Sequence, residues 1–118
     1  MIENCRITDT MLGYEDHGIL TCYLYLEGDG WSVGFGGYGL DQYDEKQNLR
    51  YSTSIGLQAI TEILNTLEVR TWEELKGKYI RAENNGIGST CDTIGHLMKN
   101  KWFSFKEFFE KHKNEENE

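Results

Sequence analysis

Residues 33–41 form a glycine-aromatic block and read Val33-Gly34-Phe35-Gly36-Gly37-Tyr38-Gly39-Leu40-Asp41. Four of the nine residues are glycine, yet valine, phenylalanine, tyrosine and leucine lie between them. Glycine inside a strand lowers stability, so such a cluster marks a bulge, a bend, or the close approach of another backbone or a ligand. Successive N–H groups in such a bend can bind an anion. The alternative interpretation is a bulged, tightly packed strand without a ligand.

The segments before the block predict strands. Residues 19–27 place four apolar side chains on one face of an extended chain: Leu20, Cys22, Leu24 and Leu26. Residues 2–13 alternate less regularly and predict a first strand. Gly28-Asp29-Gly30 has the composition of a hairpin turn, after which residues 31–38 return as the next strand. We therefore expect three sequential antiparallel strands that lead into the glycine-aromatic block.

Three segments after the block predict helical structure. Residues 54–67 follow N-cap residues and carry an apolar stripe at helical spacing: Leu57, Ile60, Ile63, Leu64 and Leu67. Thr71-Trp72-Glu73-Glu74 matches a capping box, and it starts a single helical turn that Gly77 ends. Ser104-Phe105-Lys106-Glu107 is a second capping box, and it opens a C-terminal helix.

The remaining segments complete the predicted fold. Residues 41–51 are polar and poorly patterned, which predicts a loop, whereas residues 78–83 and 91–98 predict two strands joined by a turn. The fold class is α+β, with a mainly antiparallel sheet of about five strands packed by two helices. We expect one domain over residues 1–113 and an acidic disordered tail over residues 114–118.

Composition limits the classes of function. The net charge of −8 argues against a surface that binds nucleic acid polymers and against binding to anionic membranes. The three cysteines are far apart in sequence, and no secretory segment is recognisable, so we expect reduced thiols and a cytoplasmic protein. No apolar run approaches the length that a transmembrane helix needs.

Candidate metal ligands and nucleophiles form no convincing pattern. Glu15-Asp16-His17 contains ligand-type side chains, and His17 could pair with His96 for zinc binding or acid-base catalysis. Neighbouring loop residues rarely converge on one ion, so a polar turn is the favoured interpretation. Cys22 and Cys91 lie in apolar strand patterns, where buried thiols are inert. We therefore expect no metal, no cofactor and no catalytic residue.

Cations and aromatic residues gather around the predicted hairpin of residues 78–98. Arg81 lies within its first strand, and Lys99, Lys101 and Trp102 follow its second strand. If these side chains converge near Asn84, they form a nucleotide pocket, because aromatic rings stack on bases and cations neutralise phosphates. The alternative is a solvated basic edge, with Trp102 as a core anchor for the last helix.

A weaker anion signal lies at the start of the helix predicted over residues 54–67. Its first turn presents free N–H groups, and Arg50 lies just before it. Every helix has such an end, so this signal is not specific.

Four segments together resemble one known family of proteins. They are Glu15-Asp16-His17-Gly18-Ile19-Leu20-Thr21, Gly34-Phe35-Gly36-Gly37-Tyr38-Gly39-Leu40-Asp41, Ile94-Gly95-His96 and Lys101-Trp102-Phe103. The resemblance covers residues from about 5 to 109. It points to a family of small phage and prophage proteins that includes, or lies close to, the first Thoeris anti-defence proteins, which are sponges for cyclic ADP-ribose signals.

The resemblance implies a non-catalytic protein that sequesters a cyclic nucleotide signal, either a cyclic ADP-ribose isomer or a cyclic oligonucleotide. It also implies a homo-oligomer, a dimer or higher. The residues assigned to this ligand come from the chemistry above and not from the family. A different hypothesis follows from the net charge of −8, namely an acidic phage inhibitor that binds a host defence protein directly.

The predicted ligand site therefore has residues in distinct roles. Backbone N–H groups and a close wall would come from the glycine-aromatic block: Gly36, Gly37 and Tyr38. Phosphates would meet the cations Arg81, Lys99 and Lys101, and Arg50 would add to the weaker anion signal at the helix start. Asn84 would read the edge of a base, and Trp102 would stack on its face.

Overall fold

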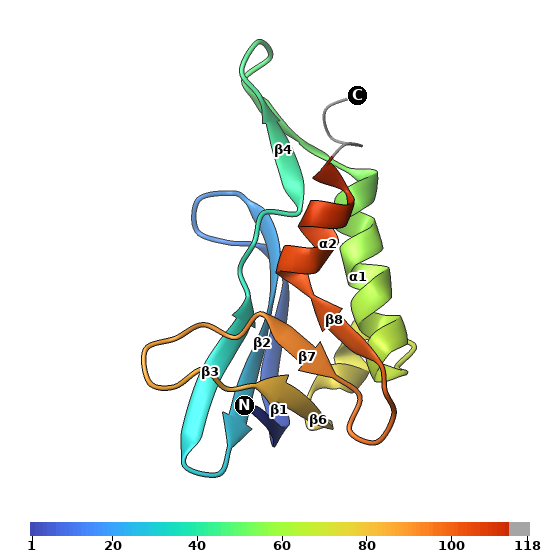
Figure 1. The fold of residues 1–118 in the computed structure, drawn as a ribbon. Coiled ribbons are helices and arrows are strands. Elements are labelled where there is room, and N and C mark those ends of the chain that lie inside the picture. Colours follow the sequence, from blue (N-terminus) through green and yellow to red (C-terminus); the bar gives the residue numbers. More distant parts are fainter. Residues whose placement is uncertain (114–118) are drawn as a thin grey trace.

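The computed structural model describes residues 1–113, so the tail predicted over residues 114–118 lies outside the described residues. The strands are β1 (Ile2–Tyr14), β2 (Leu20–Gly28), β3 (Trp31–Gly36), β4 (Asp41–Asp44), β5 (Leu49–Ser52), β6 (Tyr79–Glu83), β7 (Thr93–Gly95) and β8 (Trp102–Ser104). The helices are α1 (Ser54–Leu67), the 3-10 helix η1 (Trp72–Leu75) and α2 (Phe105–Lys111). The predicted α+β class is confirmed (Figure 1).

The main sheet has six strands in the order β3-β2-β1-β6-β7-β8, and all neighbouring strands run antiparallel. The predicted meander of three strands is confirmed as β1, β2 and β3. The hairpin predicted within residues 78–98 is confirmed as β6 and β7. An isolated parallel bridge between Phe35 and Cys91 links the segment before β7 to the edge strand β3. This bridge brings the two ends of the sheet toward each other, so the sheet curls around the core.

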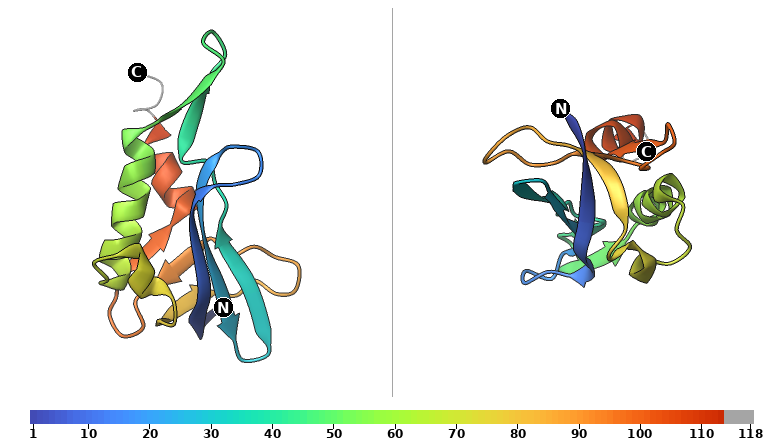
Figure 2. Two further views of the ribbon diagram at one scale, coloured as in Figure 1. Left: turned by 180° about the vertical axis from the view of Figure 1, so that it is seen from behind. Right: turned by 90° about the horizontal axis from the view of Figure 1, so that it is seen from below.

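One face of the sheet is buried, and both helices lie on that side in every view (Figures 1 and 2). The buried face carries the apolar residues predicted for residues 19–27, among them Leu24 and Leu26, which are at most 1% exposed. Five aromatic side chains fill the space between β3 and α2: Phe35, Tyr38, Phe103, Phe105 and Phe109. Burial of such large rings is the main stabilising contribution in a core of this size.

The opposite face of the sheet, called the outer face below, follows from the strand register. Residues that are directly paired point to the same face, so the pairs Arg6–Tyr79, Asn4–Arg81, Arg81–Gly95 and Gly95–Trp102 define it. Glu27 on β2 is the direct partner of Arg6, and by alternation Tyr25 and Tyr23 lie on the same face as Glu27. The outer face is therefore aromatic and charged, whereas the inner face is apolar.

The helix α1 begins and ends as its sequence predicts. Thr53 is the N-cap, and its hydroxyl oxygen accepts a hydrogen bond from the Gly56 N–H at 3.0 Å. A Cβ atom on Gly56 would collide with the carbonyl oxygen of Leu40, so glycine is required where the end of the glycine-aromatic block crosses the helix. Glu68 ends the helix in the left-handed conformation, with a φ of 56°.

Both predicted capping boxes start helical segments. The Thr71 and Ser104 hydroxyl oxygens accept hydrogen bonds from the N–H groups of Glu74 and Glu107. The Glu74 carboxylate reaches back to the N–H of Arg70 at 3.1 Å, one residue before the cap.

Two parts of the predicted strand pattern are wrong. Residues 41–51 are not a loop, because β4 and β5 pair as a separate two-stranded hairpin that projects from the body (Figure 1). The strand expected over residues 91–98 is only Thr93–Gly95, and Trp102–Ser104 adds a strand that was missed. The strand count is therefore six in the main sheet and two in the hairpin, against the five expected. Among residues 1–113, no helix is both long and apolar enough to cross a membrane.

Candidate functional site

The glycine-aromatic block is packed against β2. Gly36 and Gly37 have positive φ angles of 110° and 90°, and the Gly37 N–H donates a hydrogen bond to the carbonyl oxygen of Cys22 at 2.8 Å. A Cβ on Gly36 would collide with that same carbonyl group, and a Cβ on Gly37 would collide with the phenol of Tyr23. Close packing therefore accounts for both glycines without a ligand.

Tyr38 belongs to the aromatic core as well as to the surface. Its ring lies 4.7 Å from the ring of Phe105, and its hydroxyl donates a hydrogen bond to Asp92 at 3.4 Å. Burial raises the pKa of the Tyr38 phenol above its usual value, and the nearby Asp92 carboxylate raises that pKa further. The phenol therefore stays protonated at neutral pH.

Arg50 holds the base of the β4–β5 hairpin. Its guanidinium donates two hydrogen bonds to the Asp41 carboxylate, at 3.0 and 2.6 Å, and this carboxylate also accepts a hydrogen bond from the Leu20 N–H. The side chain of Asp41 is only 4% exposed. The hydrogen bond from Arg50 lowers the pKa of Asp41. Arg50 is thus engaged in a bidentate ion pair within its own hairpin.

Asn84 lies at the far end of β6 from the β7–β8 turn. Its side-chain amide donates to the Glu3 carboxylate at 2.7 Å, and its backbone N–H donates to the carbonyl oxygen of Met1. These contacts fasten the start of β1 to the end of β6.

Arg81 and Trp102 meet on the outer face. The Arg81 guanidinium lies 4.4 Å from the centre of the Trp102 ring. It donates hydrogen bonds to the carbonyl oxygens of His96 at 2.8 Å and Lys99 at 2.7 Å. Both acceptors are neutral, and none of the ion pairs found within residues 1–113 includes Arg81. The guanidinium is therefore held in a fixed orientation while its charge is not neutralised by a carboxylate.

Lys99 and Lys101 share a single carboxylate. Their ammonium groups lie 2.8 and 3.4 Å from Glu68, and the His96 ring nitrogen lies 3.7 Å from it. The hydrogen bond from Lys99 lowers the pKa of Glu68, so this carboxylate is ionised at neutral pH. Lys101 also donates to the carbonyl oxygen of Asn65 at 2.7 Å.

Four of the nine predicted ligand residues lie at one turn: Arg81 contacts Trp102 and donates to the Lys99 carbonyl oxygen, while the ammonium groups of Lys99 and Lys101 contact Glu68. With Glu68 and His96 these four residues form what we call the basic corner, at the β7–β8 turn. The meeting point differs from the expected one, because this turn and Asn84 lie at opposite ends of the hairpin. The other five predicted residues lie elsewhere in the fold: Asn84, Arg50, Gly36, Gly37 and Tyr38.

The carboxylate at the basic corner was missed by sequence reasoning. Glu68 is the C-cap of α1 and lies more than 30 residues before Lys99. No spacing rule joins these positions, because only the packing of α1 beside β8 makes them neighbours. The only signal in the sequence for a role of Glu68 was its position directly after a predicted helix.

The side chains considered for nucleophilic or metal chemistry lie apart. All three cysteines are buried, and burial raises the pKa of Cys5 and Cys22 to about 12 and that of Cys91 to about 11. His17 pairs with Glu15 in an exposed turn at 3.0 Å, whereas His96 belongs to the basic corner. No group of three or more metal-ligating side chains gathers within the part of the chain that the structure describes.

The basic corner offers a specific chemistry within an acidic protein. Arg81, Lys99 and Lys101 carry three positive charges beside the one negative charge of Glu68, and Trp102 adds an aromatic surface that is 37% exposed. Such a combination suits an anionic ligand with an aromatic part. In the comparisons with known proteins, no family model, no curated protein sequence and no solved structure matches this chain.

Proposed function

We propose that this protein binds a cyclic nucleotide signal and sequesters it intact, as a phage-encoded anti-defence sponge in the cytoplasm of a bacterial host. The ligand class is a cyclic ADP-ribose isomer or a cyclic oligonucleotide. The site is the basic corner, where Arg81 and the two lysines bind phosphate and Trp102 stacks on a base.

The observation that carries this proposal is the state of Arg81. Its guanidinium is oriented by two carbonyl oxygens and lies against Trp102, yet it forms no ion pair with a carboxylate of residues 1–113. A preoriented cation loses little conformational freedom when it binds an anion, which favours affinity. The family resemblance of the sequence independently favours a cyclic nucleotide as the anion.

Storage of the ligand rather than its cleavage fits the state of the thiols and of His96. The buried thiols carry raised pKa values, so at neutral pH they are almost wholly protonated and poor nucleophiles. His96 lies beside Glu68, but its ring Nδ1 accepts hydrogen bonds from the N–H groups of Met98 and Lys99, which leaves that nitrogen engaged in the turn.

A thermal-shift screen against cyclic ADP-ribose isomers and cyclic di- and trinucleotides tests the function. Ligand at about a hundred times its dissociation constant adds about 2.7 kcal/mol to the free energy of unfolding, which raises the melting temperature by several degrees. Mass spectrometry of the recovered ligand then separates storage from catalysis. The proposal requires a large shift and intact ligand; degraded ligand indicates an enzyme, and no shift with any ligand contradicts the proposal.

We also propose that the protein is a homo-oligomer, with the β4–β5 hairpin at the contact. An isolated two-stranded hairpin is marginally stable in water, and this one exposes Tyr43, Leu49 and Tyr51, each by about half or more. A second copy that covers these side chains would stabilise the hairpin. Light scattering with size-exclusion chromatography gives the mass; a Leu49→Glu, Tyr51→Glu variant should be monomeric, and a monomeric wild-type protein would rule this out.

One observation favours the second candidate function, an acidic inhibitor of a host defence protein. A hollow of about 690 Å³ between β6, β7 and α2 is lined by four carboxylates, Glu83, Asp92, Glu107 and Glu110, with Lys106 as its one cation among the described residues. Such a surface suits a basic protein partner. Charge reversal at Glu107 and Glu110 should abolish inhibition if this function is correct, and should leave it unchanged if the protein is a sponge.

A further inference from the structure

The outer face carries a second cation and a second aromatic ring beside the basic corner. Arg6 on β1 is the direct partner of Tyr79 on β6, and Asn4 is the direct partner of Arg81. Arg6 and Arg81 are therefore diagonal neighbours across two adjacent strands, a relation that separates residues by about 7–8 Å, with somewhat less between their Cβ atoms. Sequence reasoning singled out neither Arg6 as a ligand residue nor Tyr79.

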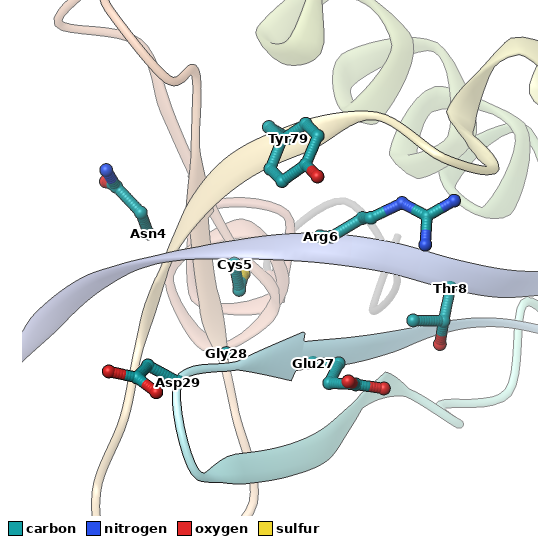
Figure 3. A pocket seen from close by; sticks show the side chains of 8 residues that line it. All are labelled: Asn4, Cys5, Arg6, Thr8, Glu27, Gly28, Asp29 and Tyr79. Atoms are coloured by element: carbon teal, nitrogen blue, oxygen red, sulfur yellow. The ribbon is translucent and has the colours of Figure 1, made fainter.

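Arg6 resembles Arg81 in that its guanidinium forms no ion pair within 4.0 Å among the described residues. Glu27 is its cross-strand partner on β2, yet among residues 1–113 no ion pair includes Arg6. Arg6 and Tyr79 line a hollow of about 370 Å³ together with Asn4, Thr8, Glu27 and Asp29 (Figure 3). Figure 3 shows the Tyr79 phenol and the Arg6 side chain extending beside each other from neighbouring strands.

Tyr79 is accessible to a flat ligand. Its side chain is 60% exposed, although it begins β6, an interior strand of the sheet. The hydroxyl groups of Tyr38 and Tyr43 donate hydrogen bonds to other side chains of the fold, whereas no hydrogen bond from the Tyr79 hydroxyl is found within the described residues. Exposed aromatic rings on an open sheet face are common platforms for base stacking.

The two pairs lie close enough to serve one ligand. Trp102 lies two strands away from Arg81, and Tyr79 lies two residues before Arg81 on the same strand. Strand spacing and rise therefore separate the Cα atoms of Tyr79 and Trp102 by about 12 Å. The Arg81 guanidinium extends toward the turn of residues 96–99, because the carbonyl oxygens of His96 and Lys99 accept its hydrogen bonds. Tyr79 therefore has cations on both sides along the sheet, Arg6 from β1 and Arg81 from the basic corner.

From this arrangement we propose that Arg6 and Tyr79 form a second subsite of the ligand site, and that the ligand is a cyclic dinucleotide. One nucleotide stacks on Trp102 with its phosphate at Arg81, and the other stacks on Tyr79 with its phosphate at Arg6. The inference rests on the proposed function, and it selects the ligands with two bases over the cyclic ADP-ribose isomers, which contain one.

The electrostatic consequence can be measured. Two guanidinium groups that form no ion pair within residues 1–113, placed beside two phosphates, make the affinity depend on salt, since each contact releases or replaces counterions. Binding of a cyclic dinucleotide should weaken steadily between 50 and 300 mM NaCl in the experiment. The slope should fall when Arg6 is replaced by alanine, because one of the two phosphate contacts is then lost.

Isothermal titration of the full chain with cyclic di-AMP, cyclic di-GMP and a cyclic ADP-ribose isomer tests the inference. Arg6→Ala and Tyr79→Ala should each weaken the preferred cyclic dinucleotide about tenfold or more, as loss of a stacking or phosphate contact does. Matched controls are Arg70→Ala and Tyr14→Ala, which remove an exposed arginine and a tyrosine that is 72% exposed, both away from the outer face. These controls should bind as the wild type does.

The outcomes separate the inference from the function on which it rests. A ligand that is lost with Trp102→Ala but bound normally by Arg6→Ala and Tyr79→Ala would overturn the second subsite and leave the sponge in place. Tighter binding of the cyclic ADP-ribose isomer than of either cyclic dinucleotide would also overturn it. Binding of none of the three ligands would overturn both proposals. Melting temperatures of the unliganded variants, expected to equal that of the wild type, exclude a folding defect.

Discussion

The glycine-aromatic block and the basic corner differ in how completely contacts within the fold explain their residues. In the block, Gly36 and Gly37 are explained by the carbonyl group of Cys22 and the ring of Tyr23. At the basic corner, Arg81 is held in place by two neutral acceptors, and it forms no ion pair with any carboxylate of the described residues. Close packing is therefore a sufficient explanation for the unusual glycines of the block. The contacts of Arg81 within the fold, in contrast, leave its positive charge available to a ligand.

The largest expected effect is a loss of stability at Gly36. Gly36→Ala introduces a Cβ that collides with the backbone of Cys22, at a φ of 110° that alanine rarely adopts. Overpacking and backbone strain together should lower the free energy of unfolding by about 3–5 kcal/mol, as measured by urea denaturation. Gly39→Ala is the matched control, because its Cβ would lie 3.4 Å from Ile19 in ordinary contact. Equal losses in the two variants would contradict the packing explanation.

A smaller effect on stability and a specific effect on binding are expected at Gly95. The Trp102 ring covers Gly95, so the Cβ of Gly95→Ala would collide with the ring and push it aside. The free energy of unfolding should fall by about 1–3 kcal/mol, because the ring must leave its packed position. Nucleotide affinity should fall with it if Trp102 stacks on a base. Unchanged affinity in a variant that is measurably destabilised would remove Trp102 from the site.

The pH dependence of stability should reveal the ion pair at the end of the block. Arg50 lowers the pKa of Asp41 below its ordinary value of 3.8. The contribution of Asp41 to stability is therefore present above pH 4 and is lost as the pH falls through its lowered pKa. Melting temperatures between pH 5 and 2 should fall more steeply for the wild type than for Asp41→Asn. Parallel curves would show that the pair contributes nothing.

The smallest expected effect is a gain in affinity at the basic corner. Glu68→Gln removes the carboxylate that Lys99 and Lys101 share, and glutamine keeps the size of the side chain. Both lysines become available to phosphate, so the dissociation constant should fall about twofold to fivefold at low salt. Isothermal titration measures this change, and Glu62→Gln on the same helix is the control. Weaker binding by Glu68→Gln would show that the carboxylate supports the site instead of competing for it.

Local chemistry explains which parts of the fold were predictable. Helix α1 and both capping boxes depend on neighbouring residues, such as Thr53 with Gly56, and they were predicted with nearly the observed bounds. The β4–β5 hairpin was missed because both of its faces are largely exposed, so no alternation marks it. Strand β8 has three residues, too few for a periodic signal.

The candidate site was harder to predict because its contacts join distant parts of the chain. The sequence placed Arg81, Lys99, Lys101 and Trp102 near one hairpin, and they do meet, but at the end opposite Asn84. Neither Glu68 nor the row of Arg6 and Tyr79 follows from any local pattern. These neighbours depend on strand order and register, which fix that β6 lies beside β1 rather than beside β3.

The most direct test of the central claim compares the two regions in one titration. Backbone amide and indole N–H signals of the labelled protein would be followed by NMR while the cyclic nucleotide with the largest thermal shift is added. The account predicts the largest changes at the Trp102 indole, at the Gly95 amide and around Lys99, with Gly36 and Gly37 almost unchanged. Changes that are largest at Gly36 and Gly37, with Trp102 unmoved, would place the ligand on the glycine-aromatic block and contradict the account.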